Sequence, residues 1–321
     1  MLHVFDRNTS ALFPRLPEGS VVLAPGEDSK NWAGAEAILS AAFDRGMARD
    51  SLFIAVGGGM VCDLTAFAAS VFMRGARLRL LPTTLLAMVD ASFGGKTAIN
   101  FGGCKNLVGT FYPAESITLS TAFLRSLPRR ELLCGLAEIV KYAMLGDAVL
   151  YEDLRKRGEG FFPPEGGLGD EAFLLDVLWR TLEVKARFVR EDPEEQGPRA
   201  YLNLGHTFGH GLEAATGFGR FTHGEAVAWG MMRALRAGRR LGITGERYAQ
   251  EATAFLKALG FPEKVRGVLA ADILRAMEKD KKKKQGEIRF VLQRGPCDNL
   301  TQSLDPAFVA EIVEDGLECN V

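Results

Sequence analysis

The chain has 321 residues, above the length at which one hydrophobic core usually stops growing, so two domains are expected. Its 39 lysines and arginines nearly balance its 40 aspartates and glutamates, which argues against nucleic acid or an anionic membrane as partners. The five cysteines lack CxxC spacing, and the sequence shows neither a signal peptide nor a long apolar stretch, so we predict a cytoplasmic protein with reduced thiols.

The N-terminal part alternates short apolar runs with helical patterns. Strands are expected at SVVLAP, SLFIAVGGG and ARLRLLP, and helices at AGAEAILSAAF and CDLTAFAASVFM. A short strand at SITLS and a helical TAFLRSLP close this region. Such alternation is typical of βα units on a parallel sheet, so an α/β domain is predicted over residues 1–127.

From residue 128 the pattern changes to long helices. They are expected at RRELLCGLAEIVKYAML, EAFLLDVLWRTLEVKARFVRED, GHTFGHGLEAAT, GEAVAWGMMRALRAGRRLG and YAQEATAFLKALG. FFPPEGGLGDE is typical of a loop, and EIRFVLQRG of a late strand. We therefore predict a second, mainly α-helical domain over residues 128–321.

Three consecutive glycines, Gly57, Gly58 and Gly59, end a predicted strand and precede a predicted helix. Glycines at this place let a phosphate approach the backbone, and the helix N-terminus favours negative charge. The spacing differs from the GxGxxG of common dinucleotide sites, so a simple tight turn is an alternative.

The stretch PTTLLAMVDASFGGKTAINFGGCKNLVGTF has an apolar pattern typical of a protein interior, yet it holds Asp90, Lys96, Asn100, Lys105 and Asn106. Buried charges are costly unless they are paired or bind a ligand, so the stretch is a candidate site. A structural network of ion pairs is the competing explanation.

In the helical half, Glu138 and Lys141 are three residues apart on an otherwise apolar helix, which predicts that they point into a buried environment. Three of the four histidines, His206, His210 and His223, occur within LNLGHTFGHGLEAATGFGRFTHGE. The spacing of His206 and His210 puts both on one helix face. Glu138 and the histidines could form a Glu/His/His site with an open position, as in catalytic zinc sites, and packing histidines are the alternative.

The segment EVKARFVREDPEEQGPRAYLN leads into the histidines and adds Lys185, Glu195, Arg199 and Asn203. At this point the order of motifs resembles the 3-dehydroquinate synthases of the sugar phosphate cyclase family, from about residue 6 to about residue 293. The motifs are GGGMVCD, RGARLRLLPTTLLAMVDASFGGKTAIN, KNLVGTFY, GLAEIVKYAML, VKARFV, RAYLNLGHTFGHGLE and HGEAV.

The resemblance implies an NAD-binding α/β domain, followed by a helical domain that binds metal and substrate. The implied reaction converts 3-deoxy-D-arabino-heptulosonate 7-phosphate into 3-dehydroquinate and phosphate, with NAD reduced and reoxidised during each turnover. It also implies a divalent metal, zinc or cobalt, and a homodimer that acts on a small phosphorylated sugar acid. Another sugar phosphate cyclase, a polyol or glycerol dehydrogenase, and a relative without turnover are the alternatives.

Site residues follow from the resemblance, motif by motif. The implied metal ligands are Glu138, His206 and His223. The implied NAD contacts are Gly26, Glu27, Lys30, Gly58, Gly59, Asp63, Thr83, Thr84, Lys96, Lys105, Phe123 and Ser126. The implied substrate contacts are Asp90, Lys96, Asn106, Lys141, Lys185, Glu195, Arg199, Asn203, His210, Lys281 or Lys282, and Arg74, which reaches the neighbouring subunit's site. His210 is thereby assigned to the substrate phosphate and not to the metal.

The sequence departs from the family pattern at three places. It reaches VFDRNTSALF almost at once, which implies an abbreviated outer part of the NAD domain. Cys104 and Thr65 stand where glycine is usual in the family. The lysine run in KDKKKKQGE is typical of a solvated loop, and only its first two lysines are candidate phosphate ligands.

Overall fold

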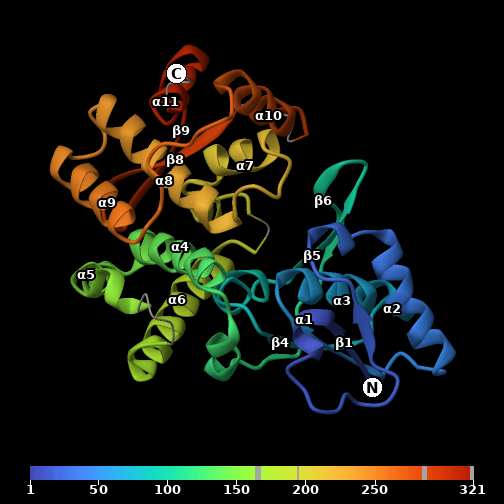
Figure 1. Cartoon of the computed structure of the whole chain (residues 1–321). Coiled ribbons are helices and arrows are strands. Elements are labelled where there is room, and N and C mark those ends of the chain that lie inside the picture. The colour runs from blue at the N-terminus through green and yellow to red at the C-terminus, as the bar shows by residue number, and fades with distance from the viewer. Residues whose placement is uncertain (163–167, 194, 284–287, 319–321) are drawn as a thin grey trace. The chain divides into compact units, whose positions relative to one another are not determined.

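A computed structural model describes residues 1–162, 168–193, 195–283 and 288–318 of the chain. The chain folds into two compact units, Met1–Leu127 and Pro128–Val321. The first is drawn in blue to cyan in Figure 1 and the second in green to red. The division falls where the sequence changes from alternating strand and helix patterns to long helices.

The first unit is built on a five-stranded sheet with the order β2-β1-β3-β4-β7, in which every pair of neighbours is parallel. The strands are β1 (Leu2–Asp6), β2 (Val21–Leu23), β3 (Leu52–Gly57), β4 (Arg77–Pro82) and β7 (Ser116–Ile117). The last four lie in the predicted runs, whereas β1 was not predicted. This order is doubly wound, because the chain runs from β1 outward to β2 and then returns across β1 to β3.

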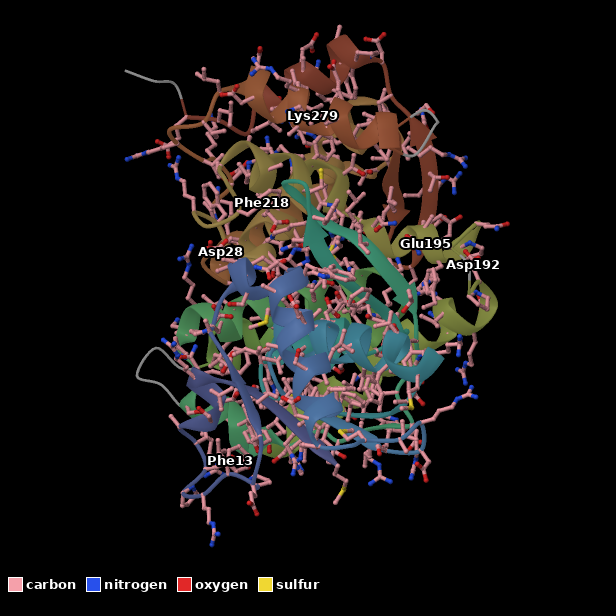
Figure 2. The ribbon with its side chains drawn as sticks, turned by 90° about the vertical axis from the view of Figure 1, so that its right-hand side faces the viewer. Phe13, Asp28, Asp192, Glu195, Phe218 and Lys279 are labelled. Carbon is pink, nitrogen blue, oxygen red and sulfur yellow. The ribbon has the colours of Figure 1, made fainter. Side chains whose placement is uncertain are left out.

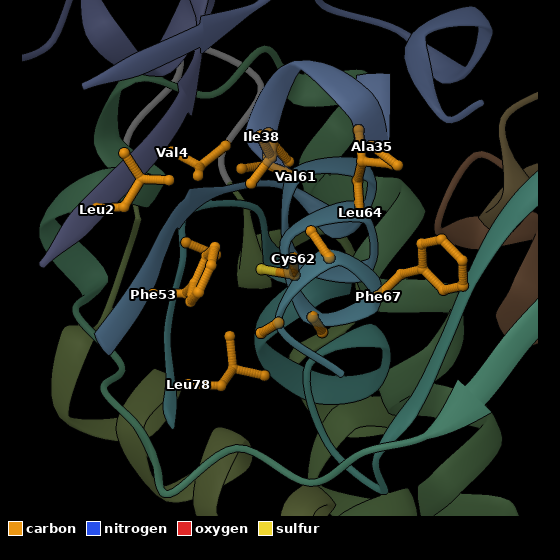
Figure 3. Packing of buried hydrophobic residues seen from close by; sticks show 14 of the residues in the cluster. Leu2, Val4, Ala35, Ile38, Phe53, Val61, Cys62, Leu64, Phe67 and Leu78 are labelled. Atoms are coloured by element: carbon orange, nitrogen blue, oxygen red, sulfur yellow. The ribbon is translucent and has the colours of Figure 1, made fainter. Parts of the chain in front are cut away.

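Helices fill the connections between these strands. They are α1 (Arg7–Ser10), α2 (Trp32–Asp44) and α3 (Gly59–Val71), with short helical turns at Glu27–Ser29, Phe72–Arg74, Ala87–Ala91 and Thr121–Ser126. Helix α3 is apolar nearly all round and packs on the sheet, while α2 packs on α3 (Figures 1 and 3). Figure 3 shows Leu2, Phe53 and Leu78 of the strands meeting Ile38 and Leu64 of the helices. Full burial of each such side chain contributes about 1.5–3 kcal/mol.

Residues 96–111 form an antiparallel hairpin of β5 (Lys96–Phe101) and β6 (Cys104–Phe111), apart from the parallel sheet. The expectation that residues 82–111 are interior was wrong for this hairpin, because Phe101, Leu107 and Phe111 are at least half exposed. It is confirmed for the residues before the hairpin, since Leu85 and Val89 are fully buried. Lys96 of the hairpin is also exposed, so its charge stays in water without the cost of burial. Thr65, in α3, is fully buried and its hydroxyl has no hydrogen-bond partner among the described residues.

The second unit is mainly helical, which together with the parallel sheet of the first unit confirms the predicted fold class. Its helices are α4 (Arg129–Gly146), α5 (Ala148–Arg157), α6 (Glu171–Glu191), α7 (His206–Ala215), α8 (His223–Arg240), α9 (Glu246–Ala258), α10 (Ala270–Lys283) and α11 (Pro306–Glu314). Single helical turns occur at Gly158–Phe161 and Pro198–Asn203. Helix α8 lies at the centre and packs against α4, α7, α9 and α11 (Figure 1).

The predicted late strand is β8 (Arg289–Gly295), which pairs in antiparallel fashion with β9 (Asp298–Ser303). Gln293 of β8 is buried, and its amide donates to Met144 O and Asn299 Oδ1, which ties the hairpin to the end of α4. The predicted loop FFPPEGGLGDE lies partly outside the described residues. Among the helices described, none has the length and apolar character needed to cross a membrane.

Candidate active site and metal centre

The predicted cofactor residues of the first unit gather after the carboxyl ends of its parallel strands. Gly26, Glu27 and Lys30 follow β2, Gly58 and Gly59 follow β3, Thr83 and Thr84 follow β4, and Phe123 and Ser126 follow β7. Doubly wound sheets bind ligands outside these strand ends, where the strand order reverses. Here the order reverses between β1 and β3, so the glycine turn lies at the expected place.

The glycine turn packs closely against the side chains of neighbouring residues. A Cβ on Gly58 would lie 3.0 Å from Thr84 Cγ2, and one on Gly59 would lie 3.2 Å from Ala91 Cβ. Gly58 is the N-cap of α3 and offers no side-chain cap among the described residues, so the first N–H groups of the helix are open to an anion. This arrangement fits the phosphates of a dinucleotide.

Lys30 links two other predicted site residues of the first unit, Asp63 and Asn106. Its Nζ donates to Asp63 Oδ2 at 2.5 Å and to Asn106 Oδ1 at 2.6 Å, and its side chain is almost fully buried. Burial raises the pKa of Asp63, and the Lys30 ammonium opposes that rise. Asn100 Nδ2 also donates to Glu27 Oε1 at 2.9 Å, so the hairpin β5–β6 is held to the loop after β2.

The other predicted residues of this unit lie nearby in sequence but on different elements. Asp90 is in the π-helical turn Ala87–Ala91, Lys96 begins β5, and the partly exposed Lys105 lies in β6. Arg74 is exposed with a φ of 65°, immediately before a turn at Gly75. Arg74 therefore presents its guanidinium on the surface of this unit.

In the second unit, glycines allow α7 and α8 to approach closely. A Cβ on Gly230 of α8 would lie 2.0 Å from Gly205 O, and one on Gly209 of α7 would lie 2.8 Å from Ala226 O. Gly205 also has a φ of 79°, a conformation that glycine adopts without steric cost, and it precedes α7 directly. Because the helices meet near their N-termini, the rings of His206 and His223 lie 5.2 Å apart between centroids.

Helix α4 approaches the N-terminal end of α8 through a further glycine, Gly224. A Cβ on Gly224 would lie 2.3 Å from Cys134 O, and Gly224 N donates to Cys134 Sγ at 3.2 Å. Glu138 is one helical turn beyond Cys134 on α4, so its carboxylate reaches the N-terminus of α8. The first residue of α8 is His223.

The three predicted metal ligands come together in this region. Glu138 Oε1 lies 3.4 Å from His223 Nε2 and 3.6 Å from His206 Nε2. Ligands at the usual zinc distances on a tetrahedron are about 3.4 Å apart, so a single ion fits among these three atoms. Glu138 is completely buried, and neither carboxylate oxygen receives a well-directed hydrogen bond from the described residues.

Hydrogen bonds from the far side of each ring point the Nε2 atoms of both histidines at Glu138. His206 Nδ1 lies 3.2 Å from Leu204 O, and His223 Nδ1 lies 3.3 Å from Glu213 Oε2. Burial acts to lower the pKa of His223, but the carboxylates of Glu138 and Glu213 outweigh it and raise the pKa to about 10. Sequence reasoning missed Glu213, although its spacing of seven from His206 puts it on the same helix face.

His210 differs from the other two histidines because its side chain is exposed. Its ring centroid lies 5.1 Å from that of His206 and 6.0 Å from that of His223. One nitrogen of His210 lies within 4.8 Å of a Glu213 oxygen and a His223 nitrogen, so these three form a second group of potential ligands. His210 is therefore beside the candidate metal centre and open to a substrate.

Lys141 and Lys185 flank the ring of Tyr142. Lys141 Nζ is 2.5 Å from Glu138 Oε2 and 4.6 Å from the Tyr142 ring centroid, and Lys185 Nζ is 6.0 Å from that centroid. Both lysines are buried, which confirms that the Glu138/Lys141 pair faces the interior. The ammonium group of Lys141 lies at the candidate centre, that of Lys185 lies near the same Tyr142 ring, and buried ammonium groups of this kind suit an anionic substrate.

The remaining polar residues of this unit lie in the loop between α6 and α7. Asn203 Nδ2 donates to Glu195 Oε1 at 2.9 Å, and the buried Arg199 donates to Pro193 O at 2.6 Å. Asp192, near Glu195 in Figure 2, accepts backbone N–H groups of the loop, including that of Arg199 at 3.1 Å. Burial acts to raise the pKa of Asp192, but these hydrogen bonds outweigh it and lower the pKa. Asp192 shapes the loop, and the sequence alone did not single it out.

Lys281 and Lys282 belong to α10, but their side chains lie outside the described residues. Their assignment to the substrate phosphate stays a prediction.

Comparisons with known proteins cover both units. A family model described as 3-dehydroquinate synthase N-terminal matches residues 20–134, and one described as 3-dehydroquinate synthase C-terminal matches residues 135–283. The 3-dehydroquinate synthase of Xanthomonas campestris pv. campestris is 41% identical over 309 residues, which cover 94% of this chain and 82% of that protein.

Two solved structures share the fold. One is 2-epi-5-epi-valiolone synthase from Streptomyces hygroscopicus subsp. jinggangensis with NAD+ and Zn2+ bound, with a TM-score of 0.89, 25% identity, and coverage of 98% of this chain and 89% of that one. The other is 2-deoxy-scyllo-inosose synthase complexed with carbaglucose-6-phosphate, NAD+ and Co2+, with a TM-score of 0.85, 23% identity, and coverage of 98% and 90%. By the match of both family models and the identity to its relatives, the chain belongs to the 3-dehydroquinate synthase family.

Proposed function

We propose that the chain is a 3-dehydroquinate synthase, a lyase that converts 3-deoxy-D-arabino-heptulosonate 7-phosphate into 3-dehydroquinate and phosphate. The observation that carries this proposal is the match of both 3-dehydroquinate synthase family models over residues 20–283. The buried Glu/His/His cluster and the surrounding cations give it chemical support. They suit a substrate that carries hydroxyl, carboxylate and phosphate groups.

A divalent metal, zinc or cobalt, is proposed to be held by Glu138, His206 and His223. The burial of Glu138 and the distances of 3.4 and 3.6 Å from its Oε1 to the two Nε2 atoms support this ligand set. Such an ion, when bound with an open position, acts as a Lewis acid on a substrate hydroxyl. Lys141 Nζ lies 2.5 Å from the second oxygen of Glu138 and pairs with it in this buried setting.

NAD is proposed to bind at the carboxyl ends of the first unit's strands, with its phosphates at the glycine turn before α3. When bound, the nicotinamide supplies a hydride acceptor and donor within one turnover. Lys30 and Asp63 are proposed to contact the cofactor, and their buried ion pair gives them a fixed geometry. Thr83 N donates to Gly57 O at 2.9 Å, which keeps the threonine pair beside the glycine turn.

The substrate is proposed to be recognised by cations and amides. Lys185 and Arg199 suit its carboxylate, while Asn203 and His210 suit its phosphate. In the first unit, Asp90, Lys96 and Asn106 are the proposed contacts. The hydrogen bond between Asn203 and Glu195 orients the Asn203 amide before the substrate binds. Less side-chain entropy is therefore lost on binding.

Two further parts of the proposal concern assembly and setting. The protein is proposed to be a homodimer, in which the exposed Arg74 of one subunit serves the neighbouring site. It is proposed to work in the cytoplasm, since its spacing of cysteines shows no disulfide framework and the described cysteines are free thiols.

Phosphate release from the heptulosonate phosphate tests the function. We expect release that requires both NAD and a divalent metal, with no net accumulation of NADH. Steady formation of NADH would indicate a polyol dehydrogenase instead. Turnover of a phosphorylated sugar without a carboxylate, and not of the heptulosonate, would indicate another sugar phosphate cyclase. Absence of any release from folded, metal-loaded protein would indicate a relative without turnover.

A further inference from the structure

Glu213 of α7 is a buried carboxylate that none of the proposed catalytic steps uses. Only 4% of its surface is exposed, and its Oε2 lies 3.3 Å from His223 Nδ1. A buried carboxylate needs a group that compensates its charge, and the ring of His223 supplies one here.

We propose that Glu213 is a positioning residue for the metal centre: it accepts the Nδ1–H of His223 and so keeps the lone pair of Nε2 directed at the metal. This inference rests on the proposed metal site of Glu138, His206 and His223, and not on the reaction that the enzyme catalyses.

The geometry of the His223 ring supports this role. A neutral imidazole carries one proton, and the nitrogen without it is the one that binds a metal. Nε2 lies 3.4 Å from Glu138 Oε1 and Nδ1 lies 3.3 Å from Glu213, so the two carboxylates contact opposite edges of the ring. A proton held on Nδ1 by Glu213 leaves Nε2 free to coordinate.

The same arrangement exists at His206, with a different acceptor. Its Nδ1 lies 3.2 Å from Leu204 O, and its Nε2 faces Glu138. The backbone carbonyl is fixed by the short helical turn before α7, whereas the acceptor for His223 is a side chain. An ionised acceptor makes a stronger hydrogen bond and increases the basicity of the ligand nitrogen.

A different assignment would make Glu213 a ligand, in the group that it forms with His210 and His223. An ion in that group would be bound by His223 Nδ1, on the opposite edge of the ring from Glu138. Glu138 Oε1, which is buried and faces the Nε2 atoms of both His206 and His223, would then have no ion to bind, while Oε2 keeps its ion pair with Lys141. The geometry therefore favours Glu213 as a hydrogen-bond partner of the ligand His223 and not as a ligand itself.

The test measures zinc affinity of the full-length protein by competition with a chromophoric chelator. The variants are Glu213→Ala and Glu213→Gln, and the control is Asp147→Asn, which alters another anchored carboxylate of the same unit. Loss of an outer-shell partner weakens metal binding about 10–100-fold, which we expect for Glu213→Ala. Glu213→Gln should lose less zinc affinity than Glu213→Ala, because the amide oxygen still accepts a hydrogen bond from His223 Nδ1. The control should bind zinc like the wild type.

Nuclear magnetic resonance of protein labelled with nitrogen-15 in histidine supplies a second readout. The chain has only four histidines, so few ring signals need assignment. In the zinc-loaded wild type, we expect His223 to coordinate through Nε2 and to show a protected, downfield Nδ1 proton. In Glu213→Ala, that proton should move upfield and exchange faster with water, while the Nδ1 proton of His206 should not change.

The outcomes separate this inference from the proposed metal site. Equal zinc affinity of wild type and both Glu213 variants overturns the inference and leaves the site intact. Coordination through His223 Nδ1 makes Glu213 a ligand and overturns it as well. An equal loss of zinc affinity in Asp147→Asn would show that the helical unit is loosened in general, and it also overturns the inference. Failure of the wild type to bind zinc overturns the metal site itself.

Discussion

The close approach of α7 and α8 predicts the effect of replacing Gly230 with alanine. The new Cβ would lie 2.0 Å from Gly205 O and 3.0 Å from Gly209 N, and both are backbone atoms that cannot rotate away. A carbon and an oxygen in contact are about 3.2–3.4 Å apart, so the helices must separate by about an ångström. Overpacking of this kind costs about 1–3 kcal/mol, while alanine gains about 1 kcal/mol in helix propensity.

We therefore expect Gly230→Ala to lower the urea midpoint of the helical unit and to weaken zinc binding, since His206 and His223 are carried by the two separated helices. Gly211→Ala in α7 is the matched control. Its Cβ would meet Met277 Cγ at 2.7 Å, a flexible side chain that can move. The reasoning is refuted if Gly230→Ala is as stable as the wild type or if the control is equally damaging.

Three further predictions concern single side chains. His223→Ala should abolish zinc binding while His210→Ala keeps it and loses turnover, as measured by zinc content and phosphate release; the reverse pattern would contradict the ligand assignment. Asp63→Asn should weaken NAD binding about tenfold by calorimetry, because it removes the buried partner of an ammonium group, and unchanged affinity would exclude the proposed contact. Burial acts to raise the pKa of Asp147, but the hydrogen bonds from Arg180 and the Leu150 N–H outweigh it and lower the pKa. The ionised carboxylate therefore stabilises the fold above its unfolded pKa, and this stabilisation is lost as the pH falls through its folded pKa. The stability advantage of wild type over Asp147→Asn should accordingly shrink in acid, and an advantage that grows in acid would refute that sign.

The fold class could be predicted because it depends on local periodicity. The apolar runs that became β3 and β4 and the long helical repeats of the second unit carry their own signal. The strand Leu2–Asp6 was missed, since a five-residue strand offers too few residues for a clear pattern. The hairpin of residues 96–111 was misjudged because apolar letters such as Phe101 and Phe111 do not reveal whether a neighbour covers them.

The candidate site was predictable in a different way. The apolar helix around Glu138 and Lys141 showed that the pair is buried, and this needed no tertiary information. The choice between His210 and His223 as a partner of His206 came from the resemblance to the family, because helical spacing alone favours His210. The role proposed for Glu213 depends on a contact between two helices, which no local pattern encodes.

The hydrogen bond from Gly224 N to Cys134 Sγ holds a buried thiol close to the candidate metal centre, and the burial limits the reactivity of that thiol. Burial raises the pKa of the Cys134 thiol to about 12, although the Gly224 N–H opposes this. At neutral pH the sulfur therefore stays protonated, and only a thiolate attacks disulfides, reacts with peroxide or captures a soft metal ion. A sulfur one helical turn from Glu138 is thus kept as a thiol, which makes it a poor nucleophile toward disulfides and peroxide beside the candidate metal centre.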